Sequence, residues 1–172
     1  MAAPANSSLD DFDWRVSIAR VGTDGPFSEF AGIDRTLAVI EGTGLELTIK
    51  DRAPITLGRA SEPISFAGDV KTSARLLAGE ITDLNVMTRR ARFSHRLTRI
   101  REPAERGLTD DDVAVVLAVN GHVIVASNSE VVTLEHRDAA VLTQSNDMTL
   151  ISPAADCECY LVLLRELRNQ PG

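Results

Sequence analysis

Histidine is scarce in this chain of 172 residues, which contains only His95, His122 and His136. A metal site carried by β-strands uses two histidines at positions i and i+2, together with a carboxylate and a further histidine. That spacing is needed because alternate residues of a strand point to the same side. None of the three histidines has a partner at that spacing. We therefore expect no metal and no other cofactor.

Cysteine is scarcer still. Cys157 and Cys159 are separated by one residue, and on a strand they would point the same way, which is a poor geometry for a disulfide. Two thiols also provide only half of the four ligands that a structural zinc ion takes. We interpret the pair as free thiols in a reducing cytosol, which favours a cytoplasmic protein.

Motifs of nucleophilic catalysis are missing as well. Neither cysteine has a histidine or a basic residue beside it in the sequence, and the chain has no G-x-S-x-G elbow. The glycines of GTGLEL and VNGHV suit hairpin turns and not phosphate-binding loops. No catalytic residue is predicted from local motifs.

Long apolar runs are also absent. No stretch approaches the ~18 apolar residues of a membrane-spanning helix. Residues 1–12 lack the basic and apolar regions of a signal peptide, and we expect them to form a short disordered leader. A membrane is therefore not an expected partner.

The chain lacks net positive charge. Its formal net charge is −7, which argues against general affinity for DNA or RNA. Nine of the 18 basic residues nonetheless fall within residues 71–106. We expect residues 83–99 to form one continuous strand with a cationic outer face toward water or a subunit partner. The arginines of that face are Arg90, Arg92 and Arg96.

Short alternating segments are abundant. WRVSIARV, residues 14–21, alternates apolar and polar residues, and similar runs follow, with turn signals such as Gly68-Asp69 and Gly79-Glu80 roughly ten residues apart. This interval is typical of a β-sandwich or barrel. A parallel α/β fold would need intervening helical segments, which the pattern lacks. The sequence predicts an all-β protein.

A charged, turn-rich segment divides the chain. We predict a first barrel over residues 13–101, a linker over 102–112 and a second barrel over 113–172. Residues 45–69 and 122–147 share one rhythm of strand, polar turn, strand, polar turn and third strand, which fits two copies of a small barrel. Asn120-Gly121, between VVLAV and HVIVA, predicts a hairpin.

Residues 14–47, WRVSIARVGTDGPFSEFAGIDRTLAVIEGTGLEL, and residues 83–90, DLNVMTRR, carry a family resemblance. Together they resemble the HutD/Ves family of bacterial proteins associated with histidine utilisation, closely from Trp14 to Arg90 and loosely elsewhere. The resemblance implies a bicupin, with two antiparallel β-barrels of the jelly-roll type in one chain, a cytoplasmic location and a capacity to form a homodimer. It also implies binding of a small intermediate of histidine breakdown, which modulates the pathway, with no established catalytic reaction.

Candidate ligand-binding residues lie first on two predicted strands. Asn85, Met87 and Arg89 share one strand face. Inside a barrel, Arg89 would form a bidentate contact with a carboxylate, Asn85 would supply a donor and an acceptor, and Met87 would form an apolar wall. Arg15 and Ser17 share a face on the strand over residues 14–21.

Further candidates lie in and after the Gly/Pro-rich loop. We expect Phe27 to act as a lid over the barrel mouth and Ser28 as a hydrogen-bonding tip, with Arg35 as a further cation near the loop.

The leading hypothesis is a metal-free protein that binds a small carboxylate, with urocanate, formiminoglutamate and formylglutamate as candidates by family resemblance. The alternative is an acid/base enzyme, a hydrolase or isomerase, acting on a histidine-pathway intermediate. A third class is a protein-interaction subunit. The sequence leaves open which ligand binds, whether any reaction is catalysed, the oligomeric state, and whether the second barrel keeps a pocket.

Overall fold

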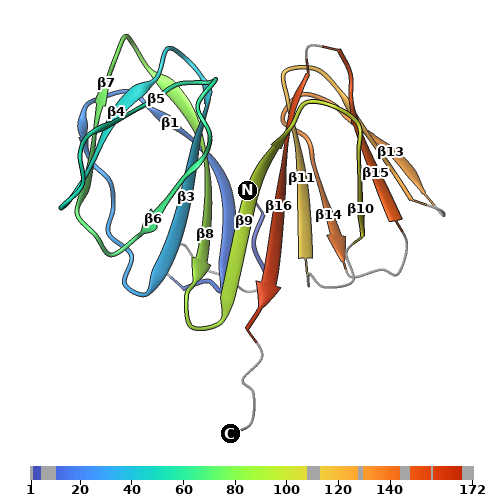
Figure 1. Ribbon diagram of the computed structural model, residues 1–172, viewed down its shortest axis with the longest axis horizontal. Helices are drawn as coiled ribbons and strands as arrows, with labels where there is room; N and C mark the ends of the chain where they lie inside the picture. Colours follow the sequence, from blue (N-terminus) through green and yellow to red (C-terminus); the bar gives the residue numbers. More distant parts are fainter. Residues whose placement is uncertain are drawn as a thin grey trace, which may run out of the picture. The chain divides into compact units, whose positions relative to one another are not determined.

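The computed structural model of the chain describes residues 2–4, 11–107, 113–127, 130–143, 148–155 and 157–167. These ranges contain strands, turns and bends but no helix, and therefore no helix that could cross a membrane (Figure 1). The predicted all-β class is confirmed. The chain divides into two compact units, Met1–Ser94 and His95–Gly172.

The first unit is built from two four-stranded antiparallel sheets. One sheet has the strand order β1-β8-β3-β6 and the other has the order β2-β7-β4-β5. Antiparallel sheets of this kind bury one face of each sheet in a shared core. The strands are β1 (Trp14–Val21), β2 (Gly25–Pro26), β3 (Ile33–Glu41), β4 (Leu45–Ile49), β5 (Ile55–Leu57), β6 (Ile64–Ala67), β7 (Thr72–Leu76) and β8 (Ile81–Arg89).

The second unit repeats this topology. Its sheets have the orders β9-β16-β11-β14 and β10-β15-β12-β13, so adding eight to each strand number of the first unit gives the second. The strands are β9 (Phe93–Ile100), β10 (Ala104–Gly107), β11 (Val113–Val119), β12 (Val123–Ala126), β13 (Val131–Leu134), β14 (Ala139–Thr143), β15 (Met148–Pro153) and β16 (Glu158–Glu166).

The repeated topology confirms the two jelly-roll barrels that the family resemblance implied. The segment over residues 45–69 contains β4, β5 and β6, and the segment over 122–147 contains the described strands β12, β13 and β14. These strands hold equivalent places in the two sheet orders. The shared rhythm of the two segments therefore reflects a shared fold.

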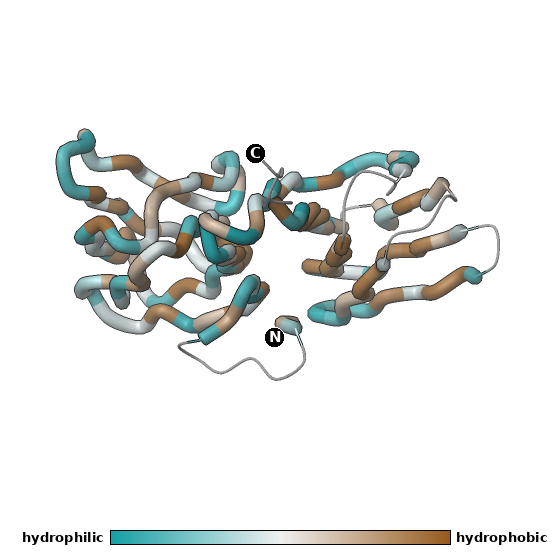
Figure 2. Tube along the Cα trace, turned by 90° about the horizontal axis from the view of Figure 1, so that it is seen from below, coloured by the Kyte–Doolittle hydropathy of each residue, from teal (hydrophilic) through white to brown (hydrophobic). Residues whose placement is uncertain are grey.

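Each barrel has an apolar interior. In the first barrel, the core includes Leu37 and Val39 on β3, Leu45 and Leu47 on β4, and Phe66 on β6. Fully burying such side chains contributes about 1.5–3 kcal/mol each. Figure 2 shows the alternation of hydrophilic and hydrophobic residues along the trace that this packing requires.

The unit boundary lies earlier than the sequence suggested. Residues 95–101, assigned to the first barrel, belong to the second unit, and the predicted linker over 102–112 contains strand β10, which pairs with β15. Charge and turn formers marked this segment as a linker, but residues 104–107 are mostly exposed and form part of a sheet. Exposed strands tolerate charged side chains.

Part of the predicted leader is ordered. Ala2 pairs with Val16 by two backbone hydrogen bonds, and Phe12 is buried against Ile33 and Met87. Residues 1 and 5–10 of the leader lie outside the described ranges.

The strand predicted over residues 83–99 is two strands. β8 ends at Arg89, a turn occupies Arg90 to Arg92, and β9 begins at Phe93. Arg90 and Arg92 therefore lie in the turn, where they pair with Asp34 and Asp13, and do not continue a strand face. A backbone hydrogen bond from Arg92 to Arg89 closes the turn.

Asn120 and Gly121 form the predicted tight turn, since both have positive φ angles, of 57° and 103°. The turn does not join a hairpin, because β11 pairs with β14 and β16, whereas β12 pairs with β13 and β15. It carries the chain from one sheet of the second barrel to the other. Local turn chemistry fixed the bend but not the strand pairing that follows it.

Candidate functional site

The central strand β8 collects polar residues on the inner face of the first barrel. β1 and β3 flank β8, so each inward residue of β8 has a neighbour on both sides. The register pairs Asp83 with Ala19 and Val39, Asn85 with Ser17 and Leu37, and Met87 with Arg15 and Arg35. The shared face predicted for Asn85 and Met87 is confirmed, as is that of Arg15 and Ser17.

Arg35 supplies a cation in the barrel interior. The residue is 5% exposed, and its Nε donates a hydrogen bond to Asn85 Oδ1 at 2.8 Å, with Nη2 donating to the same oxygen. Its guanidinium carbon lies 4.3 Å from the centroid of the Phe27 ring, within cation–π range. Burial lowers the pKa of Arg35 to about 10, which leaves the group charged at neutral pH.

Asp83 completes a hydrogen-bonded row on the same face. Asn85 Nδ2 donates to Asp83 Oδ1 at 2.6 Å, so Asn85 connects the cation of Arg35 to a carboxylate. Burial raises the pKa of Asp83 to about 6, although the Arg35 charge, the Asn85 side chain and the Ala19 backbone amide all lower it. The second carboxylate oxygen, Oδ2, is buried and has no hydrogen-bond partner among the described residues.

A pocket of about 440 Å³ opens beside this row. Arg35 and Asp83 line it together with the end of β1 and the loop over residues 22–28. Its volume falls within the range of about 300–1,000 Å³ that is common for small-molecule sites. The loop expected near the site contributes Phe27 and Ser28 to the pocket wall.

The loop is held in place by hydrogen bonds to the first and last residues of β7. The Phe27 amide donates to the Thr72 carbonyl at 2.9 Å, and the Leu76 amide donates to Asp24 Oδ1 at 2.7 Å. Phe27 also packs against the apolar core of the barrel. In this arrangement Phe27 forms a wall against Arg35, and its role as a lid stays a prediction.

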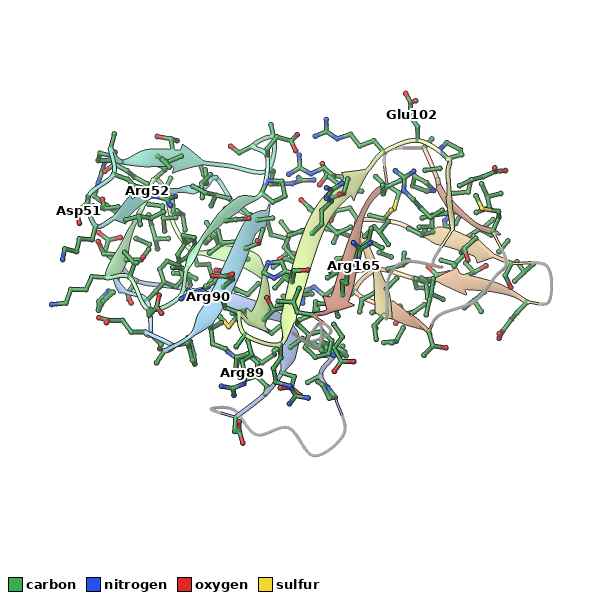
Figure 3. All side chains as sticks on the ribbon, turned by 60° about the horizontal axis from the view of Figure 1, so that its bottom comes forward. Asp51, Arg52, Arg89, Arg90, Glu102 and Arg165 are labelled. Atoms are coloured by element: carbon green, nitrogen blue, oxygen red, sulfur yellow. The ribbon has the colours of Figure 1, made fainter. Side chains whose placement is uncertain are left out.

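Arg89 does not provide the interior cation, contrary to the prediction. Its side chain is 32% exposed at the end of β8, where Nη2 binds Asp11 Oδ1 at 2.8 Å and Nε lies 3.7 Å from Asp13 Oδ1 (Figure 3). Strand alternation gave the correct face, but the strand ends at Arg89, and two carboxylates of the N-terminal segment lie within reach. Arg35 holds the interior position instead.

Arg15 and Met87 belong to a second cluster on the same face. Arg15 Nη2 lies 3.3 Å from Met87 Sδ, and the guanidinium carbon lies 4.6 Å from the Phe12 ring centroid and 5.3 Å from that of Phe30. Neither residue lines the pocket described above, and neither does Ser17. The structure thus brings Phe27, Ser28 and Arg35 to the pocket, with Asn85 directly behind Arg35.

Sequence reasoning missed Asp83. A signal was present, because Asp83 stands two residues before Asn85 and so shares its strand face. Alternation alone does not distinguish a buried aspartate from one that pairs with a nearby arginine at the surface, and surface pairs are common and weak. Its burial, at 0% exposure, depends on strands β1 and β3 on either side.

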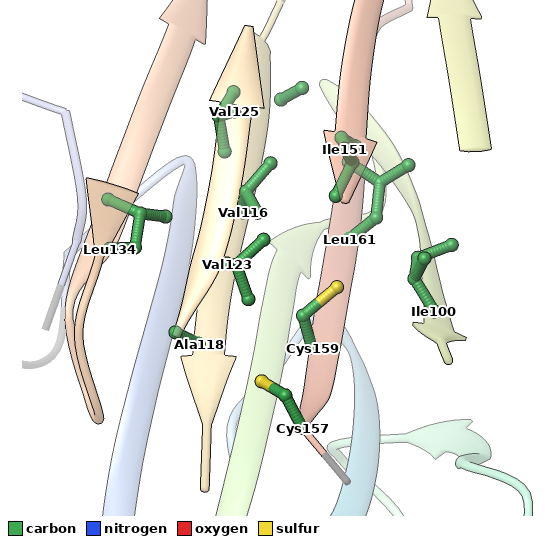
Figure 4. Close-up of a cluster of buried hydrophobic side chains, with 11 residues drawn as sticks. Ile100, Val116, Ala118, Val123, Val125, Leu134, Ile151, Cys157, Cys159 and Leu161 are labelled. Atoms are coloured by element: carbon green, nitrogen blue, oxygen red, sulfur yellow. The ribbon is translucent and has the colours of Figure 1, made fainter. Parts of the chain in front are cut away.

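The second barrel fills the corresponding interior with apolar side chains. β11 and β16 take the places of β3 and β8, and their inward residues include Val116, Ala118, Cys159 and Leu161 (Figure 4). Burial raises the pKa of Cys159 to about 12, which leaves it a neutral thiol. Among the described residues, the hydrogen-bonded row of Arg35, Asn85 and Asp83 belongs to the first barrel, and the core of the second barrel is apolar.

The three histidines all lie in the second unit, so the first barrel contains none. His122 and His136 are exposed, and His136 Nδ1 accepts a hydrogen bond from the Asn120 amide at 3.1 Å. Within the described ranges, no three histidine, cysteine, aspartate or glutamate side chains gather as a metal site.

Two jelly-roll barrels of identical strand order, one with a polar pocket at its mouth, define the class of bicupins. A cupin 2 conserved barrel domain protein from Leptotrichia buccalis shares the fold, with a TM-score of 0.54 at 10% identity over 90% of this chain and 84% of that chain. A family model described as HutD matches residues 1–160. The chain therefore belongs to the HutD family, as the resemblance indicated.

Individual relatives agree with this assignment. The chain is 31% identical over 122 residues, 71% of its length, to an uncharacterized 21.2 kDa protein in the hutC 3′ region of Pseudomonas putida, and 42% identical over 83 residues, 48% of its length, to protein Ves of Citrobacter koseri. These matches span 63% and 43% of the two relatives' own lengths. The structure of HutD from Pseudomonas fluorescens SBW25 superposes with a TM-score of 0.82 at 29% identity, covering 98% of this chain and 87% of that chain.

Proposed function

We propose that this protein is a metal-independent binding protein whose first barrel holds a small carboxylate in the pocket beside Arg35. It would act in the cytoplasm and modulate histidine degradation, with urocanate, formiminoglutamate and formylglutamate as candidate ligands. The relative named for the hutC 3′ region supports the pathway assignment. A homodimer is proposed as its assembly, and nucleic acid and membranes are not proposed as partners.

The observation that carries this proposal is the buried guanidinium of Arg35 at the pocket wall. Asn85 Oδ1 accepts from Nε and Nη2, and among the described residues no hydrogen bond uses the two N–H groups of Nη1. Charge-assisted hydrogen bonds from a guanidinium to a carboxylate are among the stronger polar contacts in proteins. Phe27 restricts the guanidinium from one side, so little motion has to be lost when a ligand binds.

The same position in the second barrel argues that Arg35 is not needed by the fold. Apolar side chains fill the equivalent interior there and form a continuous core. Burying a charged group is unfavourable unless it is paired, so an apolar residue would stabilise the first barrel more readily. Retaining a cation there is best explained by a ligand.

Thermal-shift and calorimetric titrations with the three candidate compounds test the proposal. Ligand at ~100 times its dissociation constant stabilises the folded state by about 2.7 kcal/mol, which is a readily measured shift. We expect Arg35→Gln to abolish the shift. Arg89→Gln should retain it, because Arg89 pairs with Asp11 outside the pocket.

Arg75→Gln is the matched control for loss of one arginine, since Arg75 is exposed on β7 and pairs with Glu46 away from the pocket. A ligand shift that survives Arg35→Gln but disappears in Arg89→Gln would contradict the assignment of Arg35. The absence of any shift in the wild type with all three compounds would contradict the carboxylate-binding function itself.

An acid/base enzyme is the second candidate, and Asp83 is the observation that favours it. A buried carboxyl group whose pKa is raised to about 6 can exchange a proton near neutral pH. Incubation with each candidate compound, followed by mass spectrometry of the products, separates the two functions. Turnover that is lost in Asp83→Asn would favour the enzyme, whereas binding without turnover favours the binding protein.

A further inference from the structure

Asp83 presents an unused acceptor at the pocket. Its Oδ1 takes the Asn85 amide, and the Ala19 backbone amide lies close enough to the carboxyl group to lower its pKa, but no described residue donates a hydrogen bond of normal geometry to the buried Oδ2. Buried polar atoms are nearly always paired, because an unpaired one keeps the full desolvation penalty. Asp83 is 0% exposed and borders the same pocket as Arg35, so a molecule bound in the pocket is the nearest possible source of the missing donor.

The hydrogen-bonded row fixes which groups remain for a ligand. Asn85 must turn its Oδ1 toward Arg35, because a guanidinium can only donate. Its Nδ2 therefore faces Asp83 and occupies Oδ1. Two complementary groups are left for a ligand, the donors of Arg35 Nη1 and the acceptor Asp83 Oδ2. Asn85 is hydrogen-bonded to both residues and holds them in place.

We propose that Asp83 determines the specificity of the pocket by accepting a hydrogen bond from an N–H group of the ligand whose carboxylate is bound by Arg35. The ligand class is then a carboxylate that also carries an N–H donor, such as an amide, an amidine or an azole ring. Carboxylates without a donor bind more weakly, since they leave Oδ2 unpaired beside a second negative charge. This inference rests on the proposed function.

The surrounding charges are compatible with an ionised Asp83. Arg35 on β3 faces it, and Arg20 and Asp24 lie at the pocket rim. Arg20 pairs with Glu80, and Asp24 accepts the Leu76 amide, so both rim groups already have partners. Above about pH 6 the carboxylate form of Asp83 is the dominant acceptor.

Two matched pairs of probes test the inference by calorimetry at about pH 7.5. The first pair is formylglutamate and its ester analogue, in which an oxygen replaces the amide N–H. The second is urocanate and 3-(furan-3-yl)propenoate, in which a furan replaces the imidazole. Wild-type protein should bind the N–H member of a pair about tenfold or more tightly, as expected for one hydrogen bond to a charged acceptor.

Asp83→Asn should bring the two affinities of each pair close together, mainly by weakening the N–H member. The donor-free member should bind the variant as well as or better than it binds the wild type, because a negative charge has been removed. A purely structural role for Asp83 would weaken both members alike. Equal affinities in the wild type, or a preference that persists in Asp83→Asn, would overturn the inference.

A second measurement needs no variant. The affinity of the wild type for formylglutamate should fall as the pH is lowered from about 8 to about 5.5, because Asp83 becomes protonated and loses its acceptor. The opposite result would be that affinity for the ester analogue rises over the same range while affinity for formylglutamate does not change. It would indicate that a protonated Asp83 donates to the ligand, and it would overturn the inference. Failure of the wild type to bind any of the four probes would point to failure of the proposed function, whereas binding without preference rejects the inference alone.

Discussion

At the scale of single residues, Arg35 and Asp83 are a buried pair whose charges do not meet directly. Asn85 lies between them and accepts from one and donates to the other. For both groups, burial is the largest cause of the pKa shift and opposes the charged form, and their mutual attraction only partly offsets it. The first barrel therefore carries an unfavourable electrostatic contribution that an apolar interior would avoid.

This contribution makes the stability of the protein depend on Asp83 in a defined pH window. The folded-state pKa of about 6 lies above the ordinary value of 3.8, so the folded state binds the proton more tightly than the unfolded state. The resulting stabilisation is complete below about pH 4 and is lost as the pH rises through about 6. When the pH is lowered from about 7.5 to about 4.5, the unfolding free energy of the wild type should rise by about 2 kcal/mol relative to that of Asp83→Asn.

Urea denaturation of both proteins at the two pH values measures this difference. Comparison with Asp83→Asn cancels the titration of the other carboxyl groups, which the two proteins share. A difference in unfolding free energy that does not change with pH would show that Asp83 has no raised pKa.

At the scale of elements, the connections between the two sheets of a barrel place strict demands on the backbone. Gly44 lies between β3 and β4, in different sheets, and has a φ angle of 129°, where side chains are rarely accommodated. A Cβ atom at Gly44 would lie 2.3 Å from the Leu57 carbonyl oxygen. Neither the angle nor the contact can be relieved by a side-chain rotation.

We expect Gly44→Ala to lower the unfolding free energy by about 2–4 kcal/mol. Gly22→Ala is the matched control, since a Cβ atom there meets nothing within 4 Å and should change stability by less than about 1 kcal/mol. Chemical denaturation of the three proteins checks both expectations. Equal effects of the two substitutions would argue against the backbone geometry described for Gly44.

The element scale also shows where sequence patterns reached their limit. WRVSIARV was predicted as a strand with Arg15 and Ser17 on one face, and β1 has those bounds and that face. Alternation could not show that β8 stops at Arg89, because three arginines in four residues have no strong preference for strand or turn. The strand end, set by pairing with β1 and β3, decided that Arg89 meets Asp11 and does not enter the barrel.

At the scale of the whole molecule, one topology is used twice with different interiors. The second barrel has a compact apolar core, whereas the first combines an apolar core with the row of Arg35, Asn85 and Asp83. Under the proposed function, the second barrel would contribute stability and the first barrel would contribute the ligand site.

Leu161→Ala tests that division of roles. Leu161 is 1% exposed in the core of the second barrel, and truncating such a leucine removes about 2–5 kcal/mol of stability. We expect this loss in denaturation experiments, while the affinity of the folded protein for a carboxylate ligand stays within about twofold of the wild type. A large loss of affinity without unfolding would show that the pocket depends on the second core.

The sequence by itself determined the all-β class, the two copies of one barrel, the position of most turns and the family. These properties depend on alternation, turn residues and motif order, which are local and periodic. Only the tertiary structure decided which arginine is buried, that Asp83 shares its site, and that the Asn120-Gly121 turn joins two sheets. The physical reason is that burial and strand pairing depend on which distant strands lie on either side. Residues 15, 35 and 87, for example, become neighbours only when β1, β3 and β8 pair.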